Sequence, residues 1–280
     1  MSDQGPGAEG EGEAPGNVRN GAEQPDFPYS EAPPSVPSPD LTAEAPAPGP
    51  SPPAPVFWGY SDLFLFAGLS VPAMLAGFGL VRAAISVFRL HLSRAAELLT
   101  EQFIGYLFLF LVLVVIFRFQ YDRPFWDSLG WKRMMRPPFW IVGAGWVTAF
   151  AVVLVGYAIH TPTTSNPLTE LMHDRASVLL VSIFGVTFGP LAEELAFRGF
   201  LQPLLVRSLG VLPGIVVASL PFGLLHFSEY GNSWRHVVLI CAAGMAFGWM
   251  RQATGSTKAS TLMHSAYNAL FFAALWGSRR

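Results

Sequence analysis

Three ionisable residues, Glu193, Glu194 and Arg198, lie inside a stretch of sequence that is otherwise apolar enough to enter a lipid bilayer. Charged side chains at membrane depth are rare, and they usually face a protein interior or a water-filled cavity where they have a function. On a helix, Glu194 and Arg198 are four residues apart and can form an ion pair, whereas Glu193 is rotated by about 100°. The spacing therefore predicts a supporting role for Glu194 and Arg198 and leaves Glu193 available for chemistry.

Two later apolar segments each carry a pair of side chains with the same four-residue spacing, Phe222 with His226 and His264 with Asn268. Residues four apart share one face of a helix. Either pair alone is more typical of a hydrogen bond between packed helices than of an active site. Together with Glu193, they predict three helices that converge on one buried, hydrated cavity, because the other apolar segments are nearly free of ionisable groups.

Two chemistries use such a set of side chains. In the first, Glu193 and His226 activate a water that attacks a peptide carbonyl, and His264 and Asn268 donate hydrogen bonds to the oxyanion. In the second, Glu193, His226 and His264 bind a zinc ion that activates the water. The absence of a helical His-Glu-x-x-His motif weighs against the metal, so no cofactor is expected, with zinc as the alternative.

Other hydrolase mechanisms find little support in the sequence. The apolar segments contain no Gly-x-Ser-x-Gly motif for a serine nucleophile and no paired aspartates. The single cysteine, Cys241, lies among apolar residues, and we interpret it as a buried small side chain. One cysteine also excludes an intramolecular disulfide framework.

The composition divides the chain into a polar tail and an apolar body. Residues 1–55 contain 14 of the 24 prolines and nine acidic residues against the single base Arg19, whereas the rest of the chain has 16 Lys and Arg against 10 Asp and Glu. The tail is predicted to be disordered, as an inert extension or as an arm that binds a partner. It has no signal-peptide pattern, so the first membrane helix is expected to direct targeting. The bases do not cluster as in nucleic-acid-binding proteins.

Seven apolar segments have the lengths expected of membrane helices. Two connectors between the first three spans are basic, and Trp126 and Trp131 are expected to lie at the membrane interface. Gly189 and Pro190 predict a kink in the fourth span just before the glutamates. The predicted fold is therefore an all-α polytopic membrane protein with about seven transmembrane helices, preceded by the tail. The predicted spans cover residues 62–81, 101–117, 140–159, 176–209, 212–227, 237–250 and 260–276.

The three motifs resemble those of a known family. Glu-Glu-x-x-x-Arg at 193–198, Phe-x-x-x-His at 222–226 and His-x-x-x-Asn at 264–268, on successive apolar segments, are similar to the motifs of the CAAX protease and bacteriocin-processing family, also called Abi-domain proteins. The resemblance covers roughly residues 140–276, and the Gly244-x-x-x-Gly248 stretch fits it. It implies three regions: the tail (1–55), N-terminal membrane helices with basic connectors (56–139) and a catalytic membrane region (140–280).

The resemblance implies an intramembrane endopeptidase of the glutamate type that cleaves a membrane-associated protein or peptide in the lipid bilayer. It gives Glu193 and His226 the activation of water, His264 and Asn268 the oxyanion site, and Glu194, Arg198 and Phe222 supporting roles. The bacterial inner membrane is the expected location. Two alternatives stay open. The first is a non-catalytic scaffold or immunity protein. The second is a carrier with a carboxylate proton relay, which is less favoured because no inverted repeat relates the two halves.

Overall fold

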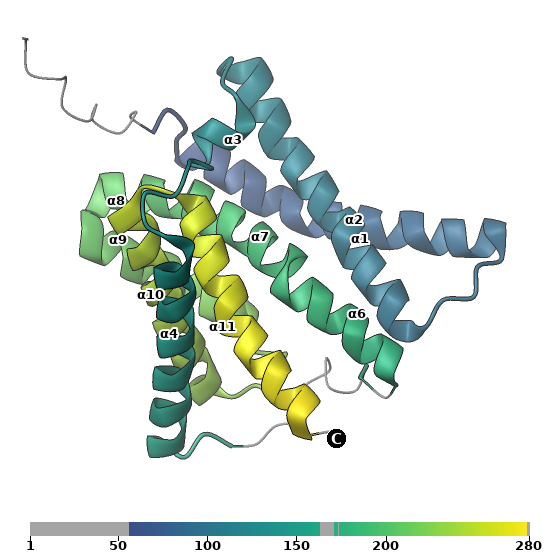
Figure 1. The fold of residues 1–280 in the computed structure, drawn as a ribbon. Helices are drawn as coiled ribbons and strands as arrows, with labels where there is room; N and C mark the ends of the chain where they lie inside the picture. Colours follow the sequence, from purple (N-terminus) through teal and green to yellow (C-terminus); the bar gives the residue numbers. More distant parts are fainter. Residues whose placement is uncertain (1–55, 163–170, 173, 279–280) are drawn as a thin grey trace, which may run out of the picture. The chain divides into compact units, whose positions relative to one another are not determined.

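The chain folds into helices, as its apolar segments predict. The computed structural model describes residues 56–162, 171–172 and 174–278, which lie within one compact unit, residues 52–280. Every regular element in those residues is helical (Figure 1), because a helix satisfies its backbone hydrogen bonds internally where no water can do so. The predictions for the tail, residues 1–55, and for most of the polar loop before the fourth span lie outside the described residues.

The helices follow the predicted spans but extend beyond them at most ends. They are α1 (Tyr60–Phe88), α2 (Arg94–Val115) with the π-helix η1 (Ile116–Gln120), α3 (Phe125–Ser128), α4 (Pro138–Ala158), α6 (Arg175–Val186), α7 (Phe188–Glu194), the π-helix η2 (Leu195–Leu201), α8 (Gln202–Leu209), α9 (Val211–Leu225), α10 (Trp234–Thr254) and α11 (Thr257–Ser278).

The described residues contain five helical segments that are long and apolar enough to cross a membrane, namely 60–88, 94–120, 138–158, 175–209 and 234–254. The other two predicted spans differ from these. Helix α9 is apolar but has only 15 residues, a length of about 22 Å against a hydrocarbon core of about 30 Å. Helix α11 has 22 residues but carries Lys258, His264 and Asn268. The protein is a multi-pass membrane protein.

The first connector is shorter than predicted. We expected it to begin at Arg82 and to continue to about residue 100, but α1 continues to Phe88 and only residues 89–93 connect it to α2. Arg82 stays in the helix because its guanidinium pairs with two carboxylates of α2, at 3.0 Å from Glu101 and 3.5 Å from Glu97. These ion pairs connect the end of α1 to α2 while the Arg82 side chain stays partly exposed.

The fourth span is broken, as Gly189 and Pro190 predict. Helix α6 ends at Val186 and α7 begins at Phe188, with Thr187 between them at φ −118° and ψ −78°. Pro190 has no N–H to donate to the carbonyl one turn earlier, which weakens the helix at that point. The Thr187 hydroxyl donates to the Ile183 carbonyl at 2.6 Å, and the break lies about two turns before the glutamates.

Packing brings the three motif-bearing segments together. Helix α11 packs between α4 and the broken span α6 to α8, and α10 packs against α9, α11 and α4 (Figure 1). The segment before α1 is fastened to the same region, because the Trp58 indole donates to the Phe200 carbonyl at 3.1 Å and its ring stacks on that of Phe200. The C-terminal half of the chain therefore supplies a frame in which η2, α9, α10 and α11 meet.

Helices α1 and α2 approach closely at two glycines, which gives a direct test of their packing. A Cβ atom on Gly77 would lie 2.5 Å from the Gly105 nitrogen and 2.8 Å from its Cα, whereas a Cβ on Gly79 would meet nothing within 4 Å. Gly77→Ala is therefore expected to destabilise the protein by about 1–3 kcal/mol through overpacking. Gly79→Ala, the matched control, should be neutral or stabilising by up to about 1 kcal/mol. Midpoints of denaturant unfolding in detergent check both, and equal midpoints would contradict the close approach.

Candidate active site

The first motif forms a buried ion pair at the point where the helix widens. Glu194 ends α7, and Arg198 lies in the following π-helix η2. The Arg198 guanidinium nitrogen Nη1 lies 3.0 Å from Glu194 Oε1, and both side chains are almost completely buried. The pairing predicted from the four-residue spacing is present. π-helical turns are uncommon and occur often at functional sites.

Two glycines of α10 let η2 and α8 approach its backbone. Arg198 Nη2 donates to the Gly244 carbonyl at 2.9 Å, and the Gln202 amide donates to the Gly248 carbonyl at 2.9 Å. A Cβ on Gly244 would lie 3.0 Å from Arg198 Nη2, and one on Gly248 would lie 2.7 Å from Gln202 Oε1. The Gly-x-x-x-Gly spacing thus has a specific use here, because it exposes two carbonyls to buried donors.

Phe222 of the second motif packs on the guanidinium. The Arg198 Cζ atom lies 4.2 Å from the centroid of the Phe222 ring, and Phe222 is itself buried. A cation above an aromatic face is attracted by the ring quadrupole, an effect that grows when water is excluded. Phe222 therefore holds Arg198 in place from α9, while Gly244 holds it from α10.

His264 of α11 completes this buried group. Its Nδ1 atom lies 3.1 Å from Glu194 Oε1, and its ring stacks on Phe247 with centroids 4.4 Å apart. Because a carboxylate only accepts hydrogen bonds, we assign the proton to Nδ1, which turns Nε2 away from Glu194. Nε2 lies 3.8 Å from Glu193 Oε2. One imidazole thus connects the two adjacent glutamates.

The two glutamates have different surroundings. The Glu194 side chain is fully buried, whereas that of Glu193 is 25% exposed, and Arg198 pairs with Glu194. The rotation of about 100° between neighbouring helical residues produces this difference. Glu193 is therefore the carboxylate that a water and a substrate can reach.

His226 lies at the end of the short helix α9. Its Nδ1 atom lies 2.8 Å from the Phe222 carbonyl, which can only accept, so the proton is on Nδ1 and Nε2 is left as an acceptor. The residue is half-buried and follows Leu225, the last residue of the helix.

The Asn268 side chain makes no hydrogen bond to another motif residue among the described residues, and it contacts the end of α6 instead. Its Nδ2 atom donates to the Gly185 carbonyl at 2.7 Å, which ties α11 to the end of α6. An amide has two N–H groups, so the second is still available as a donor. His264 and Asn268 share one face of α11, as their spacing predicts.

Glu229 is a nearby carboxylate that the sequence analysis did not single out. It lies in the turn after α9, three residues beyond His226. Although its side chain is exposed, desolvation by nearby protein atoms raises the pKa of Glu229; His226 opposes this rise and the negative charge of Glu193 adds to it. In the sequence, only its position three residues after His226 could have pointed to Glu229. A single acid in a turn is usually solvated, so this position alone did not mark it as functional.

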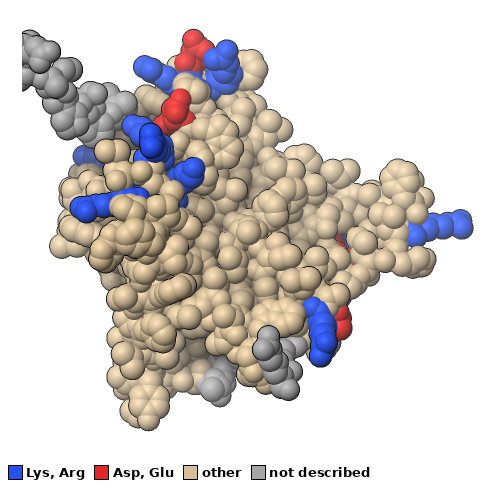
Figure 2. Space-filling model, viewed as in Figure 1, with Lys and Arg blue, Asp and Glu red and all other residues tan. Residues whose placement is uncertain are grey.

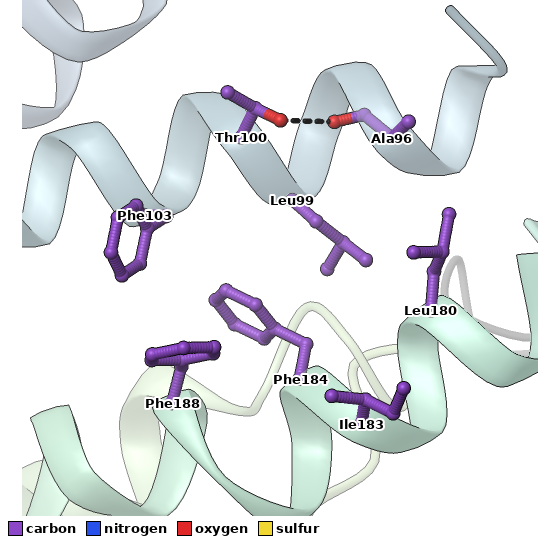
Figure 3. Close-up of a pocket in the computed structure, with 8 residues that line it drawn as sticks. All are labelled: Ala96, Leu99, Thr100, Phe103, Leu180, Ile183, Phe184 and Phe188. Atoms are coloured by element: carbon purple, nitrogen blue, oxygen red, sulfur yellow. Dashed lines mark hydrogen bonds between the residues drawn. The ribbon is translucent and has the colours of Figure 1, made fainter.

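An apolar groove lies between α2 and α6, with Phe188 at the start of α7 at its border. Figure 3 shows aromatic and aliphatic side chains of α2 and of the broken span pointing into it, and its volume is about 280 Å³. Its lining does not include Glu193, His226 or His264. Phe188, five residues before Glu193, is its lining residue nearest in sequence to the first motif, and the groove is lined by Ala96, Leu99, Thr100, Phe103, Leu180, Ile183, Phe184 and Phe188.

The three residues proposed as zinc ligands do not form a metal-binding group in this conformation. Within residues 56–162, 171–172 and 174–278, no three His, Cys, Asp or Glu side chains lie close enough together to hold a metal ion. Glu193 and His264 are neighbours, but His226 does not complete a shell with them.

Comparison with known proteins identifies the region that carries the three motifs. Residues 175–270 match the model of a family described as type II CAAX prenyl endopeptidase, Rce1-like. No curated protein and no solved structure matches the chain. The matched region begins with α6, ends within α11, and contains every residue of the three motifs. The match supports assigning residues 175–270 to the CAAX protease family.

Proposed function

We propose that this protein is an intramembrane endopeptidase that hydrolyses a peptide bond of a membrane-associated protein or peptide, with Glu193 as the general base. The observation that supports this most strongly is the division between the two glutamates. Glu194 is buried with Arg198, whereas Glu193 is accessible and lies 3.8 Å from the His264 Nε2 atom. A buried pair positions the site, and a second carboxylate beside it is free to accept a proton.

The proposed reaction uses the hydrogen-bond roles assigned above. Glu193 takes a proton from a water that also donates a hydrogen bond to His226 Nε2, and the hydroxide attacks the carbonyl carbon. In its protonated form His264 keeps Nδ1 on Glu194 and offers Nε2–H to the oxyanion, with the second N–H of Asn268 as a further donor. Glu193 then gives its proton to the leaving nitrogen as the C–N bond breaks.

The apolar groove between α2 and α6 supports a substrate with an apolar part. Its lining is mainly aromatic and aliphatic, and one lining residue, Phe188, lies on α7, the helix that carries Glu193. A lipid chain or an apolar peptide segment placed there would lose its contact with the acyl chains of the bilayer without meeting a charge. A farnesylated peptide and its unmodified form, compared as substrates, measure how much the apolar part contributes.

A single-turnover experiment in H₂¹⁸O tests the proposed role of water. With enzyme in excess over peptide, a water activated by Glu193 places one ¹⁸O in the new carboxylate of the product during the first turnover. If Glu193 instead attacked the carbonyl and formed an anhydride, hydrolysis at the glutamyl carbon would leave ¹⁸O on the enzyme and unlabelled oxygen in the first product. Mass spectrometry of product and enzyme separates the two results.

A chelator arm of the same experiment addresses the zinc alternative. Cleavage that persists at the same rate after chelation, with no metal in the purified protein, supports a glutamate base. Cleavage that is lost after chelation and restored by zinc would contradict the proposal and assign ligand roles to Glu193, His226 and His264.

A further inference from the structure

One end of the helical unit carries most of its exposed positive charge. Figure 2 shows Lys and Arg side chains gathered over the end where α3 and α8 lie in Figure 1. Only two exposed acids, Asp122 and Asp127, are found there among the described residues. The opposite end mixes both signs, with Arg82 and Arg94 paired to acids of α2. The bases of the first end are Arg118, Arg123, Lys132, Arg133, Arg136, Arg207, Arg251 and Lys258.

Hydrogen bonds hold part of this charge in a defined cluster. The loop after α3 is fastened to the turn between α10 and α11, because Thr257 N donates to the Gly130 carbonyl at 2.9 Å and Ser256 Oγ donates to the Lys132 carbonyl at 2.8 Å. This joins the loop that carries Lys132 and Arg133 to the turn that carries Lys258, although the two segments are more than 120 residues apart in the sequence. We call Lys132, Arg133, Arg136 and Lys258 the basic junction.

The bases of the basic junction have no partners within the described part of the chain. All four residues are exposed, and their side chains make no hydrogen bond or ion pair with any described residue. Arg118, by contrast, pairs with Asp122 at 2.9 Å, and Arg207 donates to the Val56 and Trp58 carbonyls. Exposed cations without counter-charges at one end of the unit favour an anionic ligand that neutralises them.

Exposed aromatic and apolar side chains surround the basic junction. Trp126, Met135 and Trp140 are 49%, 83% and 67% exposed. Tryptophan is enriched where the hydrocarbon core meets the headgroups, and bases next to it lie at the height of the lipid phosphates. This combination fits a lipid headgroup better than an acidic soluble protein, which would leave the apolar side chains uncovered.

We propose that the basic junction binds the headgroups of anionic phospholipids in the cytoplasmic leaflet. The positive-inside rule supports this side, because the connectors of this end carry the excess of Lys and Arg. Each base near an anionic surface contributes about fivefold to binding. The proposal does not depend on the peptidase activity, since lipid binding is measured without substrate.

Native mass spectrometry of the detergent-purified full chain tests the proposal. Phosphatidylglycerol and phosphatidylcholine are titrated separately, and the dissociation constant of the first bound lipid is measured. Wild type is expected to bind phosphatidylglycerol more tightly than phosphatidylcholine. Lys132→Gln/Arg133→Gln should weaken the affinity for phosphatidylglycerol by about 25-fold, because two bases contribute about fivefold each. The affinity for phosphatidylcholine should not change. The matched control Arg89→Gln/Arg175→Gln, which removes two exposed bases from the opposite end, should bind both lipids as wild type does.

Each other outcome would overturn the proposal. A wild type without preference for phosphatidylglycerol has no anionic headgroup site. If both double variants lost the same affinity for phosphatidylglycerol, the net charge of the protein and not the basic junction would determine binding. Lys132→Arg/Arg133→Lys, which keeps both charges, should bind as wild type does, and a loss of binding in this variant would show that local structure and not charge carries the effect.

Discussion

Replacing Glu193 with glutamine is expected to lower kcat/KM by about 10³-fold or more, because general-base catalysis contributes about 10²–10⁴-fold and an amide cannot accept the proton of the attacking water. The fold should be little affected. The Glu193 side chain is partly exposed, and the buried guanidinium of Arg198 pairs with Glu194 instead. An isosteric change at such a position usually alters the free energy of unfolding by less than about 0.5 kcal/mol.

The measurement compares cleavage rates and thermal unfolding for the same preparations. Glu97→Gln is the matched control, since it makes the same chemical change on α2, where Glu97 pairs with Arg82 and Arg94 away from the motifs. It should retain activity within a few-fold. A folded Glu193→Gln protein with activity close to wild type would remove Glu193 from the role of base, and a protein that no longer folds would assign it a structural role.

The sequence was most informative where contacts are local. The pair of Glu194 and Arg198 follows from the four-residue spacing alone, and the break before the glutamates follows from the missing N–H of Pro190. Apolar length predicted the helices, although not their ends. Arg82 was assigned to a connector because its partner Glu101 lies on the next helix, and no local rule connects the two.

Long-range contacts account for what the sequence could not show. The hydrogen bond of His264 to Glu194 spans 70 residues and that of Asn268 to Gly185 spans 83, so both depend on how α11 packs. The π-helix η2 also has no signal in composition, because its extra residue per turn is set by neighbouring helices. Phe222 was predicted only as a supporting residue, and its packing on Arg198 gives the physical reason.

Replacing Arg198 with methionine is expected to destabilise the protein by about 3–5 kcal/mol, because it leaves the fully buried Glu194 carboxylate without its counter-charge. Methionine fills much of the space but cannot donate to the Gly244 carbonyl or to Glu194. The same change at Arg118 is the matched control. Its ion pair with Asp122 is exposed and should contribute only about 0–1 kcal/mol.

A double variant separates the charge effect from the lost packing. Glu194→Gln/Arg198→Met has no buried charge at this pair, and the glutamine oxygen can still accept from His264 Nδ1. It should therefore be more stable than Arg198→Met alone, with a coupling energy between the two positions of about 0.5–3 kcal/mol. Denaturant unfolding in detergent measures all four proteins of this cycle. Additive effects would mean that Arg198 acts through its contacts with Phe222 and Gly244 and not as the counter-ion of Glu194, and the site would then rest on packing alone.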